Sequence, residues 1–173
     1  MPSDVRETRF RQWLTEHTGL LLKVVRSFAE EPASSDDLFQ EILLQVWMSL
    51  PNFREESKPT TWLYKVALNT ALTWKRQESK HRPLREALSL ALVAETHPAN
   101  PSDAIDRETV DRMYAAIRRL PPANRALVLL YLDGFTYREI ADVIGISETN
   151  VGVRLSRIKK QLAETVKEPS HVA

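Results

Sequence analysis

Apolar residues recur every three or four positions along most of the chain, and prolines and polar clusters divide this pattern into separate stretches. Such spacing places the apolar side chains on one face of an α-helix. In the first half of the chain it predicts helices over residues 10–28 and 38–50 and a third helix that begins near Thr60. Pro32 and Pro51 interrupt the pattern between them, and a proline seldom continues a helix.

The start of the second helix carries its own signal. Residues 34–37 read Ser-Ser-Asp-Asp, which is typical of an N-cap followed by an acidic first turn. We therefore expect the helix to begin at this point.

Two further breaks interrupt the helical pattern in the second half of the chain. A helical stripe over residues 110–120 stops at Pro121 and Pro122, and the second proline can start the next helix, where its missing N–H is not needed. That helix is expected to end at Asp133-Gly134, because glycine accepts the left-handed conformation of a helix C-terminus.

Residues 80–103 differ from the sequence on either side. Prolines and histidines bracket a short apolar stretch there without a sustained stripe, which is typical of a linker that could hold a short helix. The pattern thus predicts an all-α protein of two small helical domains, residues 8–79 and 104–167, joined by a linker at 80–103 and followed by a tail at 168–173.

Composition narrows the class of protein. The net charge is only +1, so a nucleic-acid partner would have to be recognised by local charge. The chain has no cysteine, no apolar signal core near its N-terminus and no apolar run of the ~20 residues that a membrane span needs. We expect a soluble cytoplasmic protein that does not insert into a membrane.

Enzyme chemistry is not indicated. The 4 histidines are dispersed, and no nucleophile–base or metal-ligand spacing is present. We therefore expect neither catalysis nor a cofactor or metal.

The most informative segment is TYREIADVIGISETNVGVRLSRIKK, residues 136–160. Thr136 and Glu139 have the spacing of a capping box at the start of a helix. Gly145 stands where a tight turn between helices needs positive φ, and Ser147 is a good N-cap for the next helix. This pattern predicts a helix-turn-helix.

The second helix of this pair is expected to read DNA. Val151, Leu155, Ile158 and Leu162 form its buried stripe. The opposite face presents short polar and basic groups that suit base edges and phosphates of a major groove. That face holds Thr149, Asn150, Val153, Ser156, Arg157 and Lys160, with Arg154 and Lys159 on its flanks.

Charge is distributed unevenly in the first half. Residues 27–53 contain five acidic side chains and no basic one, whereas residues 61–85 contain six basic side chains and one acidic. The acidic stretch is not suited to bind the phosphates of a nucleic acid, because like charges repel. The basic stretch is interleaved with Trp62, Tyr64 and Trp74, and aromatic rings beside cations suit unstacked bases, although tryptophans at helical spacing also commonly belong to a core.

Three motifs in order carry a resemblance to a known family. They are DDLFQEILLQVW, FREESKPTTWLYKVALNTALTWKR and LPPANRALVLLYLDGFTYREIADVIGISETNVGVRLSRIKK. Together they resemble the extracytoplasmic-function class of bacterial RNA polymerase sigma factors, and the likeness covers roughly residues 10–165. The resemblance implies a sigma factor that binds core polymerase and promoter DNA and promotes melting and transcription initiation.

The resemblance also assigns roles to residues. The first domain resembles sigma region two, whose acidic helix, with Asp37, Gln40 and Glu41, would dock on the β′ clamp helices of the polymerase. The second domain resembles region four, which binds the minus-thirty-five element as duplex. An anti-sigma factor is a further candidate partner.

By the same likeness, a loop and the helix after it would bind the minus-ten element and capture a base flipped from the single strand. The residues concerned are Arg54, Glu55, Glu56, Ser57, Lys58, Trp62, Lys65, Asn69, Lys75 and Arg76.

The chain departs from the family at two positions in the recognition helix. Gly152 stands where many relatives have a basic residue, and Val153 where they have a small polar one. Gly152 loses a phosphate contact but allows a close backbone approach, and Val153 could touch a thymine methyl group.

One alternative remains open from the residues. A helix-turn-helix regulator that binds duplex DNA without polymerase explains residues 136–160 but not the acidic helix or the segment around Trp62. Such a regulator should shift duplex DNA alone, whereas a sigma factor should need core polymerase.

Overall fold

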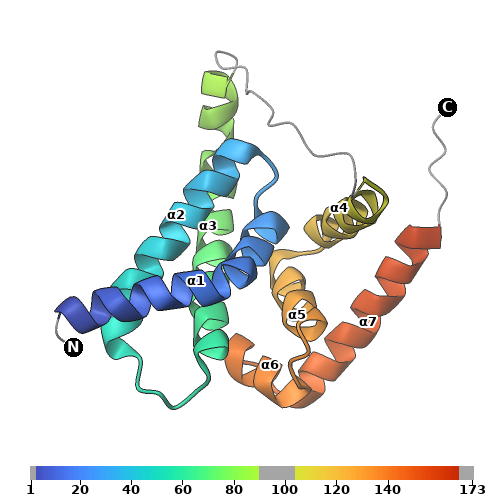
Figure 1. Ribbon diagram of the computed structural model, residues 1–173. Helices are drawn as coiled ribbons and strands as arrows, with labels where there is room; N and C mark the ends of the chain where they lie inside the picture. Colours follow the sequence, from blue (N-terminus) through green and yellow to red (C-terminus); the bar gives the residue numbers. More distant parts are fainter. Residues whose placement is uncertain (1–2, 90–103, 168–173) are drawn as a thin grey trace.

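The computed structural model describes residues 3–89 and 104–167, and every regular element in these two segments is a helix (Figure 1). The predicted all-α fold is confirmed. In chain order the elements are α1 (Ser3–Phe28), α2 (Pro32–Ser49), the short 3-10 helix η1 (Leu50–Asn52), α3 (Pro59–Ser89), α4 (Ala104–Arg119), α5 (Pro122–Leu132), α6 (Tyr137–Ile144) and α7 (Glu148–Lys167).

The N-terminal half is a bundle in which α1, α2 and α3 pack against one another. The apolar stripes read from the sequence form its core, with Phe28, Leu38, Ile42 and Leu63 at most 1% exposed. Burying a side chain of this size stabilises a fold by ~1.5–3 kcal/mol. The bundle holds α2 and α3 side by side, and these two helices carry the residues expected to contact polymerase and half of those expected to contact the minus-ten element.

The start of α2 differs from the expectation. The helix begins at Pro32, with Glu31 as an N-cap residue that makes no side-chain cap, so residues 34–37 lie inside the helix. The Ser35 hydroxyl donates to the Glu31 carbonyl oxygen at 3.0 Å instead of capping. Proline at the first helical position, preset in φ and with no N–H to leave unpaired, explains the earlier start.

The third helix is longer than expected. It continues from Pro59 to Ser89, so ten residues at the start of the expected linker are helical, Pro83 among them. A proline inside a helix removes one backbone hydrogen bond without necessarily ending the helix. The apolar part of the linker falls mostly on residues 90–103, outside the described segments.

The C-terminal half follows its sequence signals closely. Pro122 occupies the first turn of α5, and Gly134 follows the C-cap of that helix with φ 80°. Both breaks were predicted from local chemistry and are confirmed. They turn the chain so that α5, α6 and α7 pack together around Leu127, Leu130 and Ile140.

The two halves also touch. In Figure 1, α5 lies beside α1, and α6 lies beside the lower end of α3. Contacts join α1 to α4 and α5, and α3 to α5 and α6. The division into domains at residues 8–79 and 104–167 remains a prediction.

Candidate functional site

The helix-turn-helix is built by short-range hydrogen bonds. The Glu139 amide donates to the Thr136 hydroxyl oxygen at 3.2 Å, and the Thr136 amide donates to the Glu139 carboxylate at 2.8 Å. Gly145 ends α6 in the left-handed region at φ 79°, and the Ser147 hydroxyl accepts from the Asn150 amide at 3.3 Å. The capping box, the turn and the N-cap that the sequence predicted are confirmed.

Helix α7 has one buried and one exposed face. Val151, Leu155 and Ile158 are at most 2% exposed, and Leu162 is half-buried against the same core, so the predicted stripe anchors the helix. The opposite face brings together the side chains expected to bind duplex DNA. Those exposed are Thr149, Asn150, Val153, Arg154, Ser156, Arg157, Lys159 and Lys160.

Gly152 is the half-buried member of this set, because an aromatic ring from α6 lies against it. A Cβ atom at this position would lie 3.5 Å from Cε2 of Tyr137. The ring of Tyr137, itself 37% exposed, therefore occupies part of the surface beside Gly152. Sequence reasoning missed Tyr137, although its place at the start of α6 could have suggested it.

Lys159 interacts mainly with α5. Its Nζ donates to the Tyr131 hydroxyl at 2.8 Å and lies 4.0 Å from the centre of the same ring. This hydrogen bond raises the pKa of the Lys159 ammonium. The charge remains at the surface, but its position is set by Tyr131.

The loop before α3 is exposed throughout, from Arg54 to Lys58. Glu55 has φ 60°, a left-handed conformation that is uncommon for a residue other than glycine. Its carboxylate receives a hydrogen bond of 2.9 Å from Arg9 on α1. Arg9 therefore offsets one of the two glutamate charges that would otherwise repel a DNA strand.

An aromatic cluster fixes both ends of this loop. Trp62 makes edge contacts with Trp13 and Phe53 at centroid distances of 5.6 and 5.5 Å, and Trp13 also meets Phe53 at 4.9 Å. Edge-to-face pairs add about 0.5–1.5 kcal/mol beyond the area they bury. Trp62 is half-buried, so it serves the core with part of its ring, and its contact with a base stays a prediction.

The polar side chains of α3 form a second exposed strip. Lys65, Asn69 and Arg76 are exposed, and Lys75 is half-buried and paired with Glu78 at 2.7 Å. The Arg76 guanidinium donates to the Thr73 hydroxyl at 3.3 Å. Lys65 and Asn69 share one side of the helix, because they are four residues apart. A single strand of DNA that runs along this side could contact both.

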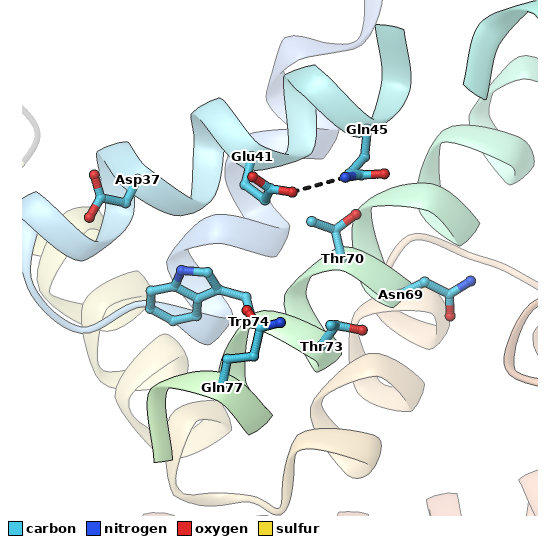
Figure 2. A pocket seen from close by; sticks show the side chains of 8 residues that line it. All are labelled: Asp37, Glu41, Gln45, Asn69, Thr70, Thr73, Trp74 and Gln77. Carbon is cyan, nitrogen blue, oxygen red and sulfur yellow. Dashed lines mark hydrogen bonds between the residues drawn. The ribbon is translucent and has the colours of Figure 1, made fainter. Parts of the chain in front are cut away.

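On α2, Asp37 and Gln40 are exposed and Glu41 is half-buried. Gln45 donates to the Glu41 carboxylate at 2.9 Å. These two residues line a groove of about 570 Å³ between α2 and α3. Figure 2 shows Asp37 and Glu41 on the α2 side of it and Asn69 and Trp74 on the α3 side. The structure thus places the acidic helix and part of the expected DNA-binding strip along the same groove.

Two exposed apolar side chains extend the acidic face and were missed from the sequence. Leu44 and Met48 are 49% and 59% exposed. With Asp37 and Glu41 they fall at helical spacing along one side of α2. That spacing was visible in the sequence, but both residues resemble ordinary core positions.

The described residues hold neither a candidate membrane span nor a candidate metal site. No helix there is long and apolar enough to cross a membrane. Among the same residues, no group of three or more histidine or acidic side chains is placed to hold a metal ion.

Two family models match the chain in the order of its two halves. Residues 7–81 match the model described as "Sigma-70 region 2". Residues 111–162 match the model described as "Sigma-70, region 4". The first match covers α1 to most of α3, and the second covers α5 to most of α7 with part of α4.

Individual proteins agree with the family models. The chain is 32% identical over 185 residues to the ECF RNA polymerase sigma factor SigG of Mycobacterium tuberculosis, covering 93% of this chain and 50% of SigG. It is 30% identical over 146 residues to the probable RNA polymerase sigma factor RfaY of Xanthomonas campestris, covering 82% of this chain and 35% of RfaY. The chain therefore spans between a third and a half of the length of these relatives.

A solved structure shares the arrangement of helices. The sigma factor RpoE of Bartonella quintana, crystallised with the anti-sigma factor NepR, superimposes with a TM-score of 0.67 at 21% identity, covering 92% of this chain and 97% of RpoE. At this identity the likeness speaks for the fold.

Proposed function

The chain belongs to the sigma-70 family of RNA polymerase sigma factors, in its extracytoplasmic-function class, and from this premise we propose that it binds core polymerase and directs it to promoters. In this proposal the protein recognises a minus-thirty-five element as duplex and a minus-ten element as a melted strand. It acts in the cytoplasm, where its polymerase partner is.

One observation carries the proposal. The chain presents an acidic face on α2 and cation-bearing faces on α3 and α7, each exposed and each on a different helix. Acidic side chains repel phosphate, so the α2 face fits a protein partner with cations. Cations beside short polar groups on α7 fit duplex DNA.

Polymerase docking is proposed for the α2 face. Asp37, Gln40 and Glu41 would contact the β′ clamp helices, and Leu44 and Met48 would add apolar area beside them. Protein interfaces commonly combine an apolar centre with a polar rim. Docking at this face would explain why α2 exposes two apolar side chains to water.

Duplex recognition is proposed for α7. Thr149, Asn150 and Val153 near its N-terminal end would meet base edges, and Arg157 and Lys160 would contact phosphates further along. The sequence preference at the minus-thirty-five element would then depend on Gly152 and Tyr137 as well.

Capture of a melted strand is proposed for the loop and α3. Lys58, Lys65 and Asn69 are exposed along one route for the strand, and the loop at Arg54–Lys58 would hold an extruded base. Unstacking a base costs a few kcal/mol, which contacts to the base and the backbone would offset. The protein supplies binding energy and no chemical step.

An anti-sigma factor is also proposed as a partner. The similar RpoE structure contains one, and the chain shares its helical arrangement.

The deciding experiment combines the purified chain with core polymerase on a library of promoter sequences and maps the start sites. We expect new start sites that depend on the chain, with a shared motif at each of the two promoter elements. Core polymerase alone is the control. If the chain shifts duplex DNA by itself and creates no start site, it is a helix-turn-helix regulator and the proposal fails.

A further inference from the structure

The loop before α3 has fixed ends and an exposed middle. Phe53, where the loop begins, packs edge-on against Trp13 of α1 at a centroid distance of 4.9 Å and against Trp62 of α3 at 5.5 Å. Residues 54–58, which follow, are all exposed, so the burial of apolar area does not determine their conformation. That conformation must therefore come from backbone preferences and polar contacts.

The backbone of the loop does not favour this shape by itself. Glu55 has φ 60°, and a glutamate enters this left-handed region only at a cost, because its Cβ crowds the following carbonyl oxygen. Within residues 3–89 and 104–167, every other residue with positive φ is a glycine. An unfavourable backbone conformation persists only where surrounding contacts hold it.

Arg9 of α1 provides such a contact. Its guanidinium donates to the Glu55 carboxylate at 2.9 Å. The Arg9 side chain is 28% exposed and that of Glu55 is 67% exposed, so the arginine is the more firmly held partner. Arg9 and Trp13 are four residues apart and share one face of α1. This face therefore supports the loop at two points, with Trp13 at the start of the loop and Arg9 at its middle.

We propose that Arg9 is a positioning residue for base capture: through Glu55 it holds the loop in the conformation that receives the extruded base of the minus-ten strand. The inference rests on the proposed function and adds to it a residue of α1, outside the loop and α3. Arg9 acts on the loop and does not itself contact DNA. A loop that is already ordered binds its ligand more tightly, because less of the binding energy goes into fixing its shape.

The test uses the complex of the full chain with core polymerase. Fluorescence anisotropy would measure its affinity for a labelled single-stranded oligonucleotide that carries the minus-ten motif of the mapped start sites. A partly exposed ion pair is modest in strength, so Arg9→Gln should weaken this binding about threefold to fivefold. Arg9→Lys keeps the charge and should lose less of the affinity.

Two controls confine the effect to the loop. The affinity for a duplex fragment with the minus-thirty-five motif should not change in Arg9→Gln, because α7 is proposed to bind that element and Arg9 lies on α1. Arg11→Gln breaks the exposed pair of Arg11 with Glu7 within α1 and should change neither affinity. An equal loss on both DNA fragments in Arg9→Gln would overturn the proposal.

A second background separates positioning of the loop from a direct contact with phosphate. Glu55→Gly removes the carboxylate, and glycine adopts positive φ without the cost of a side chain. Arg9→Gln should therefore have no further effect on minus-ten binding when it is combined with Glu55→Gly. If Arg9 contacted a phosphate, Arg9→Gln would weaken binding in both backgrounds and reduce its salt dependence by about one counterion.

The outcomes are distinct. A loss of minus-ten affinity in Arg9→Gln that disappears in the Glu55→Gly background supports the proposal. Wild-type affinity in Arg9→Gln overturns it, and so does an equal loss in the two backgrounds. Failure of the proposed function looks different, because the wild-type chain would then create no start site and would bind no minus-ten strand together with core polymerase.

Discussion

Gly152 shows how one missing side chain changes the surface of α7. An interior glycine costs a helix about 1 kcal/mol relative to alanine. The space above it is bounded by Tyr137, at 3.5 Å from an added Cβ, which is an ordinary van der Waals distance. The position therefore has room for a methyl group, and a side chain of that size would not clash with Tyr137.

Gly152→Ala should for this reason stabilise the protein by about 0.5–1 kcal/mol. Urea unfolding followed by circular dichroism would measure the change in free energy. Lys160→Arg, at an exposed position of the same helix, exchanges two residues of similar helix propensity, so it is the control and should have little effect. Destabilisation by Gly152→Ala would mean that Tyr137 cannot keep its place beside a methyl group.

Arg157 and Lys159 differ in how they would act on DNA. Arg157 is exposed on the outer face of α7, whereas Lys159 is held by Tyr131. With core polymerase present, Arg157→Ala should reduce the dependence of promoter binding on salt by about one counterion. Lys159→Ala should reduce it less. Equal slopes for the wild type and Arg157→Ala would place Arg157 away from phosphate.

At the scale of elements, α6 depends on its N-terminal cap. The helix has 8 residues, too few to be stable alone, so its end groups matter more than in a long helix. Thr136→Ala should cost about 1 kcal/mol of stability by leaving the Glu139 amide without its acceptor. Thr136→Ser should keep the bond. Thermal unfolding of the three proteins would compare them, and an unchanged Thr136→Ala midpoint would contradict the role of the cap.

The same cap predicts a dependence on pH. Hydrogen bonds from the Thr136 amide and hydroxyl lower the pKa of the Glu139 carboxyl below its ordinary value of 4.5. Stability from this carboxylate is thus present above pH 4.5 and lost as the pH falls through the lowered pKa. Glu139→Gln should weaken the decline in unfolding temperature over that acidic range. A decline of the same steepness in both proteins would argue against a contribution from Glu139.

Elements with local signals could be predicted from the sequence, and those shaped by longer-range packing could not. Thr136, Gly145 and Ser147 each act within a few residues, and all three behave as predicted. The start of α2 was misplaced because residues 34–37 resemble a cap, whereas Pro32 begins the helix. Trp62 is partly buried because it packs against Trp13, 49 positions away in the chain. No local sequence pattern reveals such a contact.

At the scale of the whole molecule, the arrangement of charge was visible in the sequence but the meeting of the two halves was not. Arg125 contacts Ser27 across 98 positions, and Lys23 contacts Asp133 across 110. Charged side chains normally face solvent, so nothing in the sequence indicates that Arg125 contacts Ser27 or that Lys23 contacts Asp133. The expected surfaces on α2, α3 and α7 are exposed, while their relative placement comes from the structure alone.

Asp37→Arg tests the partner of the acidic face. The substitution places a cation where a basic partner is proposed, so affinity for core polymerase should fall about tenfold or more. Because Asp37 is exposed, the fold should be unaffected. Glu164→Arg, with the same charge change on exposed α7, is the control. Affinities from biolayer interferometry that fall equally in both variants would point to net charge alone.

The ring contact between Trp13 and Trp62 has a practical consequence. Indole emission depends on neighbouring aromatic rings and on exposure to water. This pair lies beside the loop that is proposed to receive an extruded nucleobase. Any displacement of that loop would alter the native fluorescence of the protein. The chain therefore carries an optical reporter at the point where strand separation would begin, and the event could be followed in time without attaching a dye.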